Sequence, residues 1–117
     1  ILILDSRIGA VTEPGKIEIK GVDTQVIDAS GKTIIPGFID SHVHILGGGG
    51  EGGPATRAPE ISVENIISCG VTTVIGCLGT DGTTRHMESL LAKARALEEE
   101  GITAFIFSGS YEIPVRL

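Results

Sequence analysis

Two parts of this chain share one layout, in which a helix-like stretch ends at a glycine and runs directly into an apolar strand. The first junction is Gly70-Val71-Thr72-Thr73, and the second, Gly101-Ile102-Thr103-Ala104, follows 31 residues later. Parallel strands need helical crossovers of this kind. A (β/α)₈ barrel of about 250 residues repeats at a similar interval, and so does a doubly wound sheet. The spacing therefore predicts a parallel α/β unit and leaves both architectures open.

The local patterns give the elements of this unit. The nearly continuous apolar run from Ile34 to Ile39 predicts a strand buried on both faces. Ser62 can cap a short helix that Gly70 ends, and Thr83 or Thr84 can cap a longer one that ends at Gly101. Strands are expected over residues 71–75 and 102–107. The apolar helix positions follow helical spacing and are Val63, Ile66 and Ile67, then Met87, Leu90, Leu91, Ala94 and Leu97.

Residues 1–35 have a different character and predict part of a small, antiparallel β domain. Alternating or apolar segments at 16–20, 24–28 and 32–35 indicate short strands, with turns at Pro14-Gly15 and Ser30-Gly31. Residues 36–117 would then form the first βαβαβ portion of a larger unit. Three parallel strands cannot close a barrel and would leave open edges. We therefore expect the remainder of the protein to lie beyond Leu117, and the absence of an initiator Met suggests that the chain begins inside a longer reading frame.

Composition excludes several classes of partner. The net charge of −6 and a pI near 4.9 argue against nucleic acid, and Lys and Arg are too scattered for a membrane anchor. No apolar run approaches the roughly 18–20 residues of a membrane span. Two cysteines without an export signal do not predict a disulfide scaffold. We expect a cytoplasmic protein in which Cys69 and Cys77 serve packing.

The chemistry of the chain centres on Asp40-Ser41-His42-Val43-His44, at the end of the first predicted buried strand. Residues i and i+2 of a strand point to the same side, so His42 and His44 can converge on one metal ion. The alternative is a histidine pair that only makes hydrogen bonds, but the buried strand before it and the glycine-rich loop after it favour metal. A catalytic zinc needs at least three protein ligands. The third histidine, His86, suits a capping or surface role, so the other ligands must lie elsewhere.

The run Ile35-Pro36-Gly37-Phe38-Ile39-Asp40-Ser41-His42-Val43-His44 resembles the signature that opens the barrel in the amidohydrolase superfamily. The preceding 26–32 segment resembles the small β-domain lead-in of those enzymes. Further segments are similar to the isoaspartyl (β-aspartyl) dipeptidases, and the loop with Glu51 is the most specific of them. They are Gly47 to Pro54, Thr56-Arg57, Pro59-Glu60, Leu78 to Asp81, Arg85-His86, Glu88 to Lys93 and Gly109-Ser110-Tyr111.

This resemblance implies a fold and a function. The fold would be the start of a metal-dependent-hydrolase (β/α)₈ barrel preceded by part of a small β-sandwich, with the barrel incomplete in this chain. The enzyme would be a zinc-dependent metallopeptidase that cleaves the isopeptide bond of β-aspartyl dipeptides, with a binuclear centre and a homo-oligomeric full-length form. Its remaining metal ligands and catalytic aspartate lie on later strands, so these 117 residues alone should be inactive.

The resemblance also implies a role for each matching residue. His42 and His44 would bind one zinc ion. Glu51 would hold the free α-ammonium of the substrate, with the Gly49 backbone close by. Thr80 would contact the substrate, and Tyr111 would close over the site and polarise the scissile carbonyl while metal-activated water attacks it.

Other interpretations stay open. Glu51 could be a solvated loop charge, and the glycine run is a weak match to a phosphate cradle because no Gly-Lys-Ser/Thr follows it. The protein could be a different amidohydrolase, such as a dihydroorotase-like cyclic amidase or a deacetylase, which would not need the Glu51 loop. It could also be a non-catalytic assembly subunit, although such relatives tend to lose the histidine pair.

Overall fold

The computed structural model describes residues 1–115 of the 117. The chain forms two compact units, Ile1–Ile34 and the part that begins at Ile35, and each is described by itself. In the first unit, strands β1 (Leu2–Leu4) and β2 (Arg7–Ala10) form an antiparallel hairpin. Its turn contains Asp5 at φ 52, a left-handed conformation that aspartate tolerates better than most residues.

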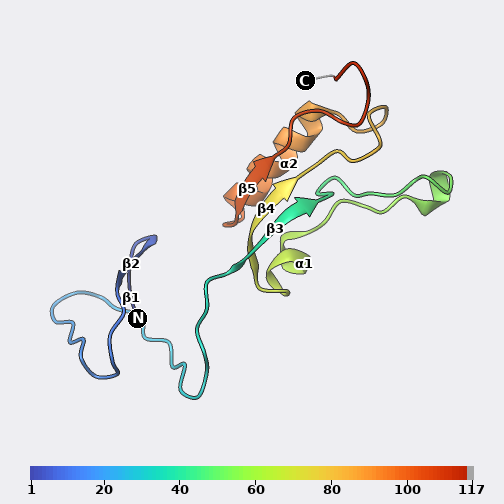
Figure 1. Ribbon diagram of the computed structural model, residues 1–117. Coiled ribbons are helices and arrows are strands. Elements are labelled where there is room, and N and C mark those ends of the chain that lie inside the picture. The colour runs from blue at the N-terminus through green and yellow to red at the C-terminus, as the bar shows by residue number, and fades with distance from the viewer. Residues whose placement is uncertain (116–117) are drawn as a thin grey trace. The chain divides into compact units, whose positions relative to one another are not determined.

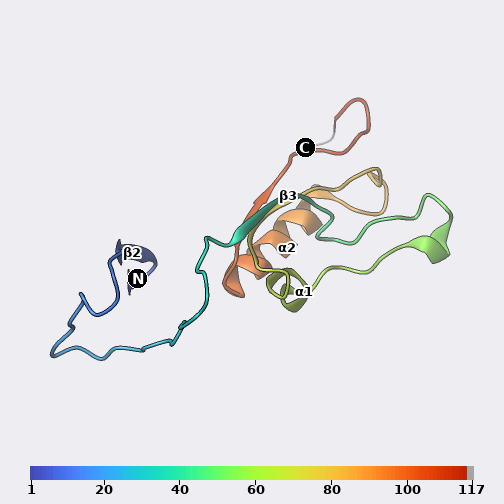
Figure 2. The ribbon, with the colours of Figure 1, turned by 60° about the horizontal axis from the view of Figure 1, so that its bottom comes forward.

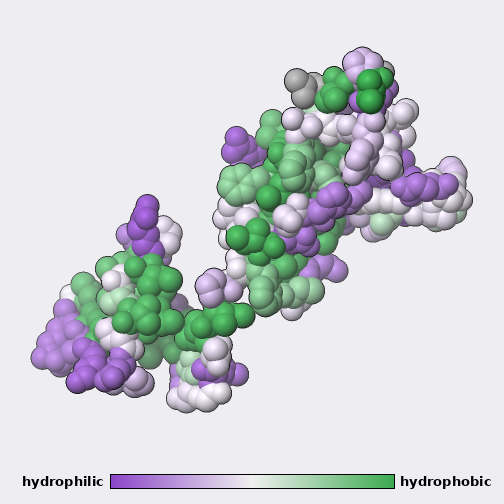
Figure 3. All heavy atoms as spheres, viewed as in Figure 1, coloured by the Kyte–Doolittle hydropathy of each residue, from purple (hydrophilic) through white to green (hydrophobic). Residues whose placement is uncertain are grey.

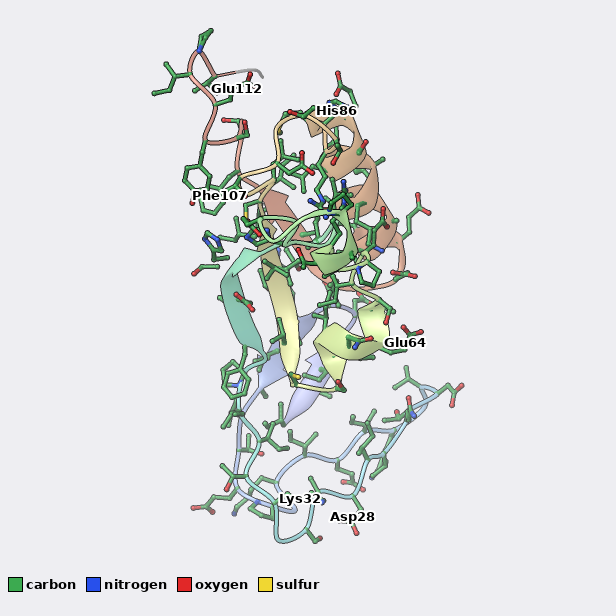
Figure 4. All side chains as sticks on the ribbon, turned by 90° about the vertical axis from the view of Figure 1, so that its right-hand side faces the viewer. Asp28, Lys32, Glu64, His86, Phe107 and Glu112 are labelled. Atoms are coloured by element: carbon green, nitrogen blue, oxygen red, sulfur yellow. The ribbon has the colours of Figure 1, made fainter. Side chains whose placement is uncertain are left out.

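The turns predicted in this unit form, but the strands predicted between them do not. Gly15 and Gly31 take φ 76 and 71, and a carboxylate oxygen of Asp28 accepts both the N–H and the hydroxyl of Ser30. Asp28 and Lys32 flank that turn (Figure 4). Residues 16–20, 24–28 and 32–35 are not strands. An extended segment becomes a strand only when a neighbour takes up its N–H and C=O groups, and within residues 1–115 the two strands of the hairpin pair only with each other. The β-sandwich stays a prediction.

The second unit contains a three-stranded parallel sheet with the order β3-β4-β5 (Figure 1). Its strands are β3 (Phe38–Val43), β4 (Val71–Gly76) and β5 (Thr103–Ile106). A loop with one 3₁₀ turn, η1 (Pro54–Thr56), and helix α1 (Val63–Ile67) connect β3 to β4. Helix α2 (Met87–Glu99) connects β4 to β5. The parallel α/β arrangement predicted from the 31-residue repeat is thus confirmed.

Both helices pack on one face of this sheet (Figure 2). Leu90, Ala94 and Leu97 of α2 and Ile66 of α1 are buried against residues such as Val74 of β4. On the other face, Ile39 of β3 and Phe105 of β5 are exposed, and Figure 3 shows apolar atoms gathered there. The prediction of a first strand buried on both faces was therefore wrong. Strand β3 starts at Phe38, and Ile39 is 68% exposed, because only one face of the sheet is covered.

The helix boundaries follow from capping. The Ser62 hydroxyl accepts the N–H of Asn65, and Gly70 takes φ 75 at the predicted stop. Helix α2 begins at Met87 and not after Thr83 or Thr84, because the Asp81 carboxylate takes up the N–H groups of both threonines in a separate turn.

Two predicted helix contacts do not form. Ile67 and Leu91 were expected on the buried faces, but they are exposed because the covered stripe of each helix is narrower than its apolar pattern. Within residues 1–115, no helix is long and apolar enough to cross a bilayer.

Candidate metal centre

The predicted site residues lie where the three parallel strands end. His42 is in β3 and His44 follows it, Thr80 lies after β4, and Tyr111 lies after β5. Figure 4 shows Phe107 and Glu112 beyond this carboxyl end of the sheet, whereas Glu64 of α1 lies toward the opposite end. Loops at the carboxyl ends of parallel strands are where α/β enzymes place their ligands.

The two histidines converge, as their i, i+2 spacing predicts. The ring centroids of His42 and His44 are 5.5 Å apart with an angle of 45° between the planes. His42 is exposed and His44 is half-buried. A carboxylate oxygen of Asp40 accepts the backbone N–H of His42 at 3.1 Å, which fixes the strand end that presents both rings.

A third donor, Cys77, joins this pair. One ring nitrogen each of His42 and His44 and the sulfur of Cys77 all lie within 4.8 Å of one another. The thiol is 8% exposed, and burial raises its pKa. Cys69, in contrast, is exposed, so the packing role predicted for it was wrong. Imidazole nitrogen and thiolate sulfur are the donors that zinc prefers, so this group of residues fits a zinc-type ion.

Glycines make room for the half-buried ring of His44. A Cβ built on Gly79 would lie 2.2 Å from Cε1 and 2.7 Å from Nδ1 of that ring, and one on Gly48 would lie 3.3 Å from Nδ1. Gly79 also takes φ 71, a conformation that side chains disfavour. The loops that carry Gly48 and Gly79 therefore pack against the His44 ring. At Gly79 the backbone can lie this close to the ring only because the residue has no side chain.

The loop after His44 carries Glu51 to the end of β4. The hydroxyl of Thr80 donates a hydrogen bond of 2.8 Å to Oε1 of Glu51. This bond is the largest cause that lowers the pKa of Glu51, and the charges of His44 and Arg85 add to it. The Glu51 carboxylate is exposed and ionised at neutral pH, so it can receive a cationic group from solvent.

A buried arginine, to which the sequence pattern alone assigns no role, anchors this loop. Arg85 is 5% exposed, and its guanidinium donates to the carbonyl oxygens of Leu46 at 3.2 Å and Gly48 at 3.3 Å. It also donates to the Asp81 carboxylate at 3.0 Å. Hydrogen bonds from Thr84, then Thr83, lower the pKa of Asp81 to about 2. A charged arginine that follows a strand-end aspartate by four residues is the signal that could have revealed this anchor.

Arg57 also holds this loop in place, through contacts with Thr84 and Asp81. Its Nη1 donates to the Thr84 hydroxyl at 2.6 Å, and its Nη2 lies 3.7 Å from the Asp81 carboxylate. The backbone of Arg57 forms an isolated antiparallel bridge with that of Gly49. Gly49 takes φ 71, and a Cβ atom added to it would lie 2.5 Å from the Thr56 carbonyl oxygen. The Gly49 backbone is thereby fixed two residues before Glu51.

A hollow of about 290 Å³ opens beside the histidines and is lined by His42, Cys77, Gly79 and residues 107–111. Tyr111 belongs to its wall and is 71% exposed. Glu51 and Thr80 contact each other but do not line this hollow. Of the two roles predicted for His86, the structure fits the surface one, since its exposed side chain makes no capping hydrogen bond at the start of α2.

The chain resembles solved and sequenced enzymes. One similar solved structure is the crystal structure of a β-aspartyl dipeptidase from Fervidobacterium islandicum AW-1 in complex with the β-Asp-Leu dipeptide. The two chains are 60% identical and superpose with a TM-score of 0.67. The match covers 69% of this chain and 22% of the dipeptidase chain. An adenine deaminase of Halalkalibacterium halodurans is 37% identical over 64% of this chain and 11% of its own length. A dihydroorotase of Geobacillus thermodenitrificans is 34% identical over 85% and 22% respectively.

The chain thus spans less than a quarter of each of these relatives. The chain also matches a family as a whole. Residues 25–94, which include both histidines, Glu51 and Cys77, match the sequence profile of the Amidohydrolase family, and the chain belongs to that family.

Proposed function

We propose that the protein is a zinc-dependent metallopeptidase that hydrolyses the isopeptide bond of β-aspartyl dipeptides. The observation that carries the proposal is the ionised Glu51 carboxylate, held at the end of β4 by a hydrogen bond from the hydroxyl of Thr80. The 60% identity to a dipeptidase solved with β-Asp-Leu supports the same reading. In a β-aspartyl dipeptide, one methylene separates the scissile carbonyl from the carbon that carries the α-ammonium and the free α-carboxylate, whereas in an ordinary dipeptide the carbon with the ammonium is bonded directly to that carbonyl. A carboxylate that binds the ammonium at this distance can therefore position the scissile bond.

Glu51 is suited to this task by its charge state and its support. A lowered pKa keeps the carboxylate ionised, and an ionised carboxylate makes stronger hydrogen bonds to an ammonium than a neutral acceptor does. Thr80 uses only Oε1, which leaves Oε2 for the substrate. The Gly49 backbone, which its bridge with Arg57 holds two residues before Glu51, would offer its carbonyl to a second ammonium proton.

His42 and His44 would hold one metal ion, and the donor group described above fits zinc. When bound, zinc would supply a water of lowered pKa and a Lewis acid for the scissile carbonyl. Tyr111 would donate its phenolic hydrogen to the carbonyl oxygen as negative charge develops there. Its place on the wall of the hollow that His42 lines supports this role.

The architecture we propose is a (β/α)₈ barrel that begins with β3, β4 and β5, in a cytoplasmic homo-oligomer that binds a small dipeptide. The parallel sheet with helices on one face supports the barrel, since its open apolar face is the one that a barrel would bury.

The test is the hydrolysis of β-Asp-Leu and of N-acetyl-β-Asp-Leu by the protein at its natural full length, with metal content measured in parallel. We expect wild type to prefer the free amine and Glu51→Gln to lose about 10–100-fold in kcat/KM, the value of a hydrogen bond to a charged group, toward β-Asp-Leu alone. Glu99→Gln makes the same chemical change on the exposed face of α2 and should have no effect. Unchanged kinetics in Glu51→Gln would remove its role, and ring-opening of dihydroorotate without dipeptide hydrolysis would favour the cyclic amidase.

A further inference from the structure

Cys77 lies beside the histidine pair because of the register between β3 and β4. Val43 pairs with Gly76, the residue before Cys77, and the carbonyl oxygen of Val43 accepts the backbone N–H of Cys77 at 2.9 Å. Val43 is the residue between His42 and His44. The cysteine is therefore the cross-strand neighbour of the whole His-x-His segment, and both its backbone and its side chain are fixed against that segment.

The side chain of Cys77 is placed for a shared ion. Its sulfur and one nitrogen from each ring lie within 4.8 Å of one another. With zinc–nitrogen bonds of about 2.0–2.1 Å and zinc–sulfur bonds of about 2.3 Å, two donors on one tetrahedral ion are separated by about 3.3–3.6 Å. Rotations of the three side chains that move their donor atoms by about 1 Å would bring them to this separation. The thiol also lines the hollow that His42 lines, so an ion can reach it although the residue is largely buried.

No competing role occupies this thiol. The thiol lies 3.6 Å from the carbonyl oxygen of Val43, a weak contact that a metal–sulfur bond could replace, and the backbone N–H of Gly79 interacts with the sulfur. The second cysteine makes a useful contrast. The sulfur of Cys69 is exposed, contacts only the Ser68 hydroxyl at 4.0 Å and is not in the donor group.

We infer that Cys77 is a third protein ligand of the cation held by His42 and His44, so that this chain alone offers a nitrogen–nitrogen–sulfur donor set. On binding, the thiol proton passes to solvent and the sulfur lone pair forms the bond to the cation, as is general for cysteine ligands. A thiolate makes the site softer, which favours zinc and cadmium over magnesium and manganese. The inference rests on the metal-binding part of the proposed function and not on its substrate.

The experiment replaces the native metal with cobalt(II) in the protein at its natural full length and records its absorption spectrum. A thiolate ligand gives a near-ultraviolet sulfur-to-cobalt charge-transfer band that imidazole and carboxylate ligands do not give. We expect the band in wild type, its loss in Cys77→Ser and Cys77→Ala, and its retention in Cys69→Ser. Competition with a chromophoric chelator should show that Cys77→Ser binds zinc about 10–100-fold more weakly than wild type. Mutation of a residue that only hydrogen-bonds to a metal ligand typically has an effect of this size, and loss of a ligand itself should cost at least as much.

The inference would be overturned by cobalt-loaded wild type without the band, which needs no variant to fold, or by a Cys77→Ser spectrum that keeps the band. A wild type that takes up no cobalt would overturn it as well. The experiment also separates this inference from the proposed function. A charge-transfer band without hydrolysis of β-Asp-Leu would support the role of Cys77 and reject the dipeptidase function. Hydrolysis of β-Asp-Leu without the band would support the dipeptidase function and reject the role of Cys77.

Discussion

The hydroxyl of Thr80 donates a hydrogen bond of 2.8 Å to Oε1 of Glu51, a residue 29 positions earlier in the chain. This bond joins the loop after β3 to the loop after β4, and it lowers the pKa of the Glu51 carboxylate more than any other contact does. It therefore sets both the position and the charge of the group that we propose receives the substrate ammonium.

Thr80→Val keeps the shape of the side chain and removes the donor. The pKa of Glu51 should rise toward its ordinary value, and the carboxylate should lose its fixed position. We expect KM for β-Asp-Leu to increase about tenfold, since a hydrogen bond to a charged group is lost, with a smaller change in kcat. Steady-state kinetics test this, and Thr80→Ser, which keeps the hydroxyl, serves as the matched control. Equal KM values for all three proteins would contradict the positioning role of Thr80.

Removal of Arg85 should destabilise the fold, because its buried guanidinium satisfies two carbonyl oxygens and one carboxylate. Arg85→Met leaves these acceptors without their donor, and we expect a loss of about 2–4 kcal/mol in the free energy of unfolding. Arg85→Lys should recover only part of it, since an ammonium cannot reproduce the planar fork. Urea denaturation measures the loss.

Arg95→Met is the control for this change. Arg95 pairs with Glu98 on the exposed face of α2, where its side chain is 70% exposed. A surface pair of this kind contributes about 0–1 kcal/mol. A loss in Arg95→Met as large as that in Arg85→Met would mean that burial and the loop contacts do not set the effect.

Asp81 should make stability depend on pH in the acid range. Its pKa is lowered from 3.8 to about 2 in the folded protein, so the folded state binds a proton less readily than the unfolded chain. Its contribution is complete above pH 3.8 and is lost as the pH falls toward 2. We expect the unfolding midpoint of wild type to fall more steeply over this window than that of Asp81→Asn, measured with chelator so that metal loss does not contribute.

Asp23→Asn controls for the general effect of removing one carboxylate. Asp23 is exposed and makes no side-chain contact among the residues that the structure covers. This variant should follow the wild-type curve through the acid range. A curve for Asp81→Asn that is parallel to wild type would show that the hydrogen bonds from Thr84 and Thr83 do not persist in solution.

Local patterns predicted much of the second unit. The helix and strand order around Gly70 and Gly101 follows from side-chain periodicity and from glycine stops, which act within a few residues. The convergence of His42 and His44 follows from strand geometry alone. The strands expected in residues 16–35 did not form because strand pairing depends on a partner elsewhere in the chain, and an alternating pattern does not supply one.

The parts of the site that the sequence did not reveal depend on contacts between distant segments. The spacing of Arg85 four residues after Asp81 hints at an ion pair, but the hydrogen bonds from Arg85 to Leu46 and Gly48 appear only when the loop after β3 folds over it. Cys77 was expected to serve packing because its position beside the histidines requires the register between β3 and β4. Both residues show that donors and anchors at strand ends become visible only once neighbouring strands are aligned.

Gly79→Ala tests whether backbone packing against His44 controls metal binding. The added Cβ would lie 2.2 Å from Cε1 and 2.7 Å from Nδ1 of His44, so the ring must move. The change also strains a residue at φ 71 by roughly 1–2 kcal/mol. We expect metal affinity to fall about 10–100-fold, since the ring loses its orientation.

Gly70→Ala separates strain from displacement of the ring. Gly70 takes a similar φ of 75, but its Cβ would only touch the Phe38 ring at 3.4 Å. Both variants should therefore lose comparable stability in urea, while only Gly79→Ala should lose zinc in equilibrium dialysis. If both variants retain the metal equally well, the close approach of Gly79 to His44 does not matter for binding, and the orientation of the ring must come from the strand end itself.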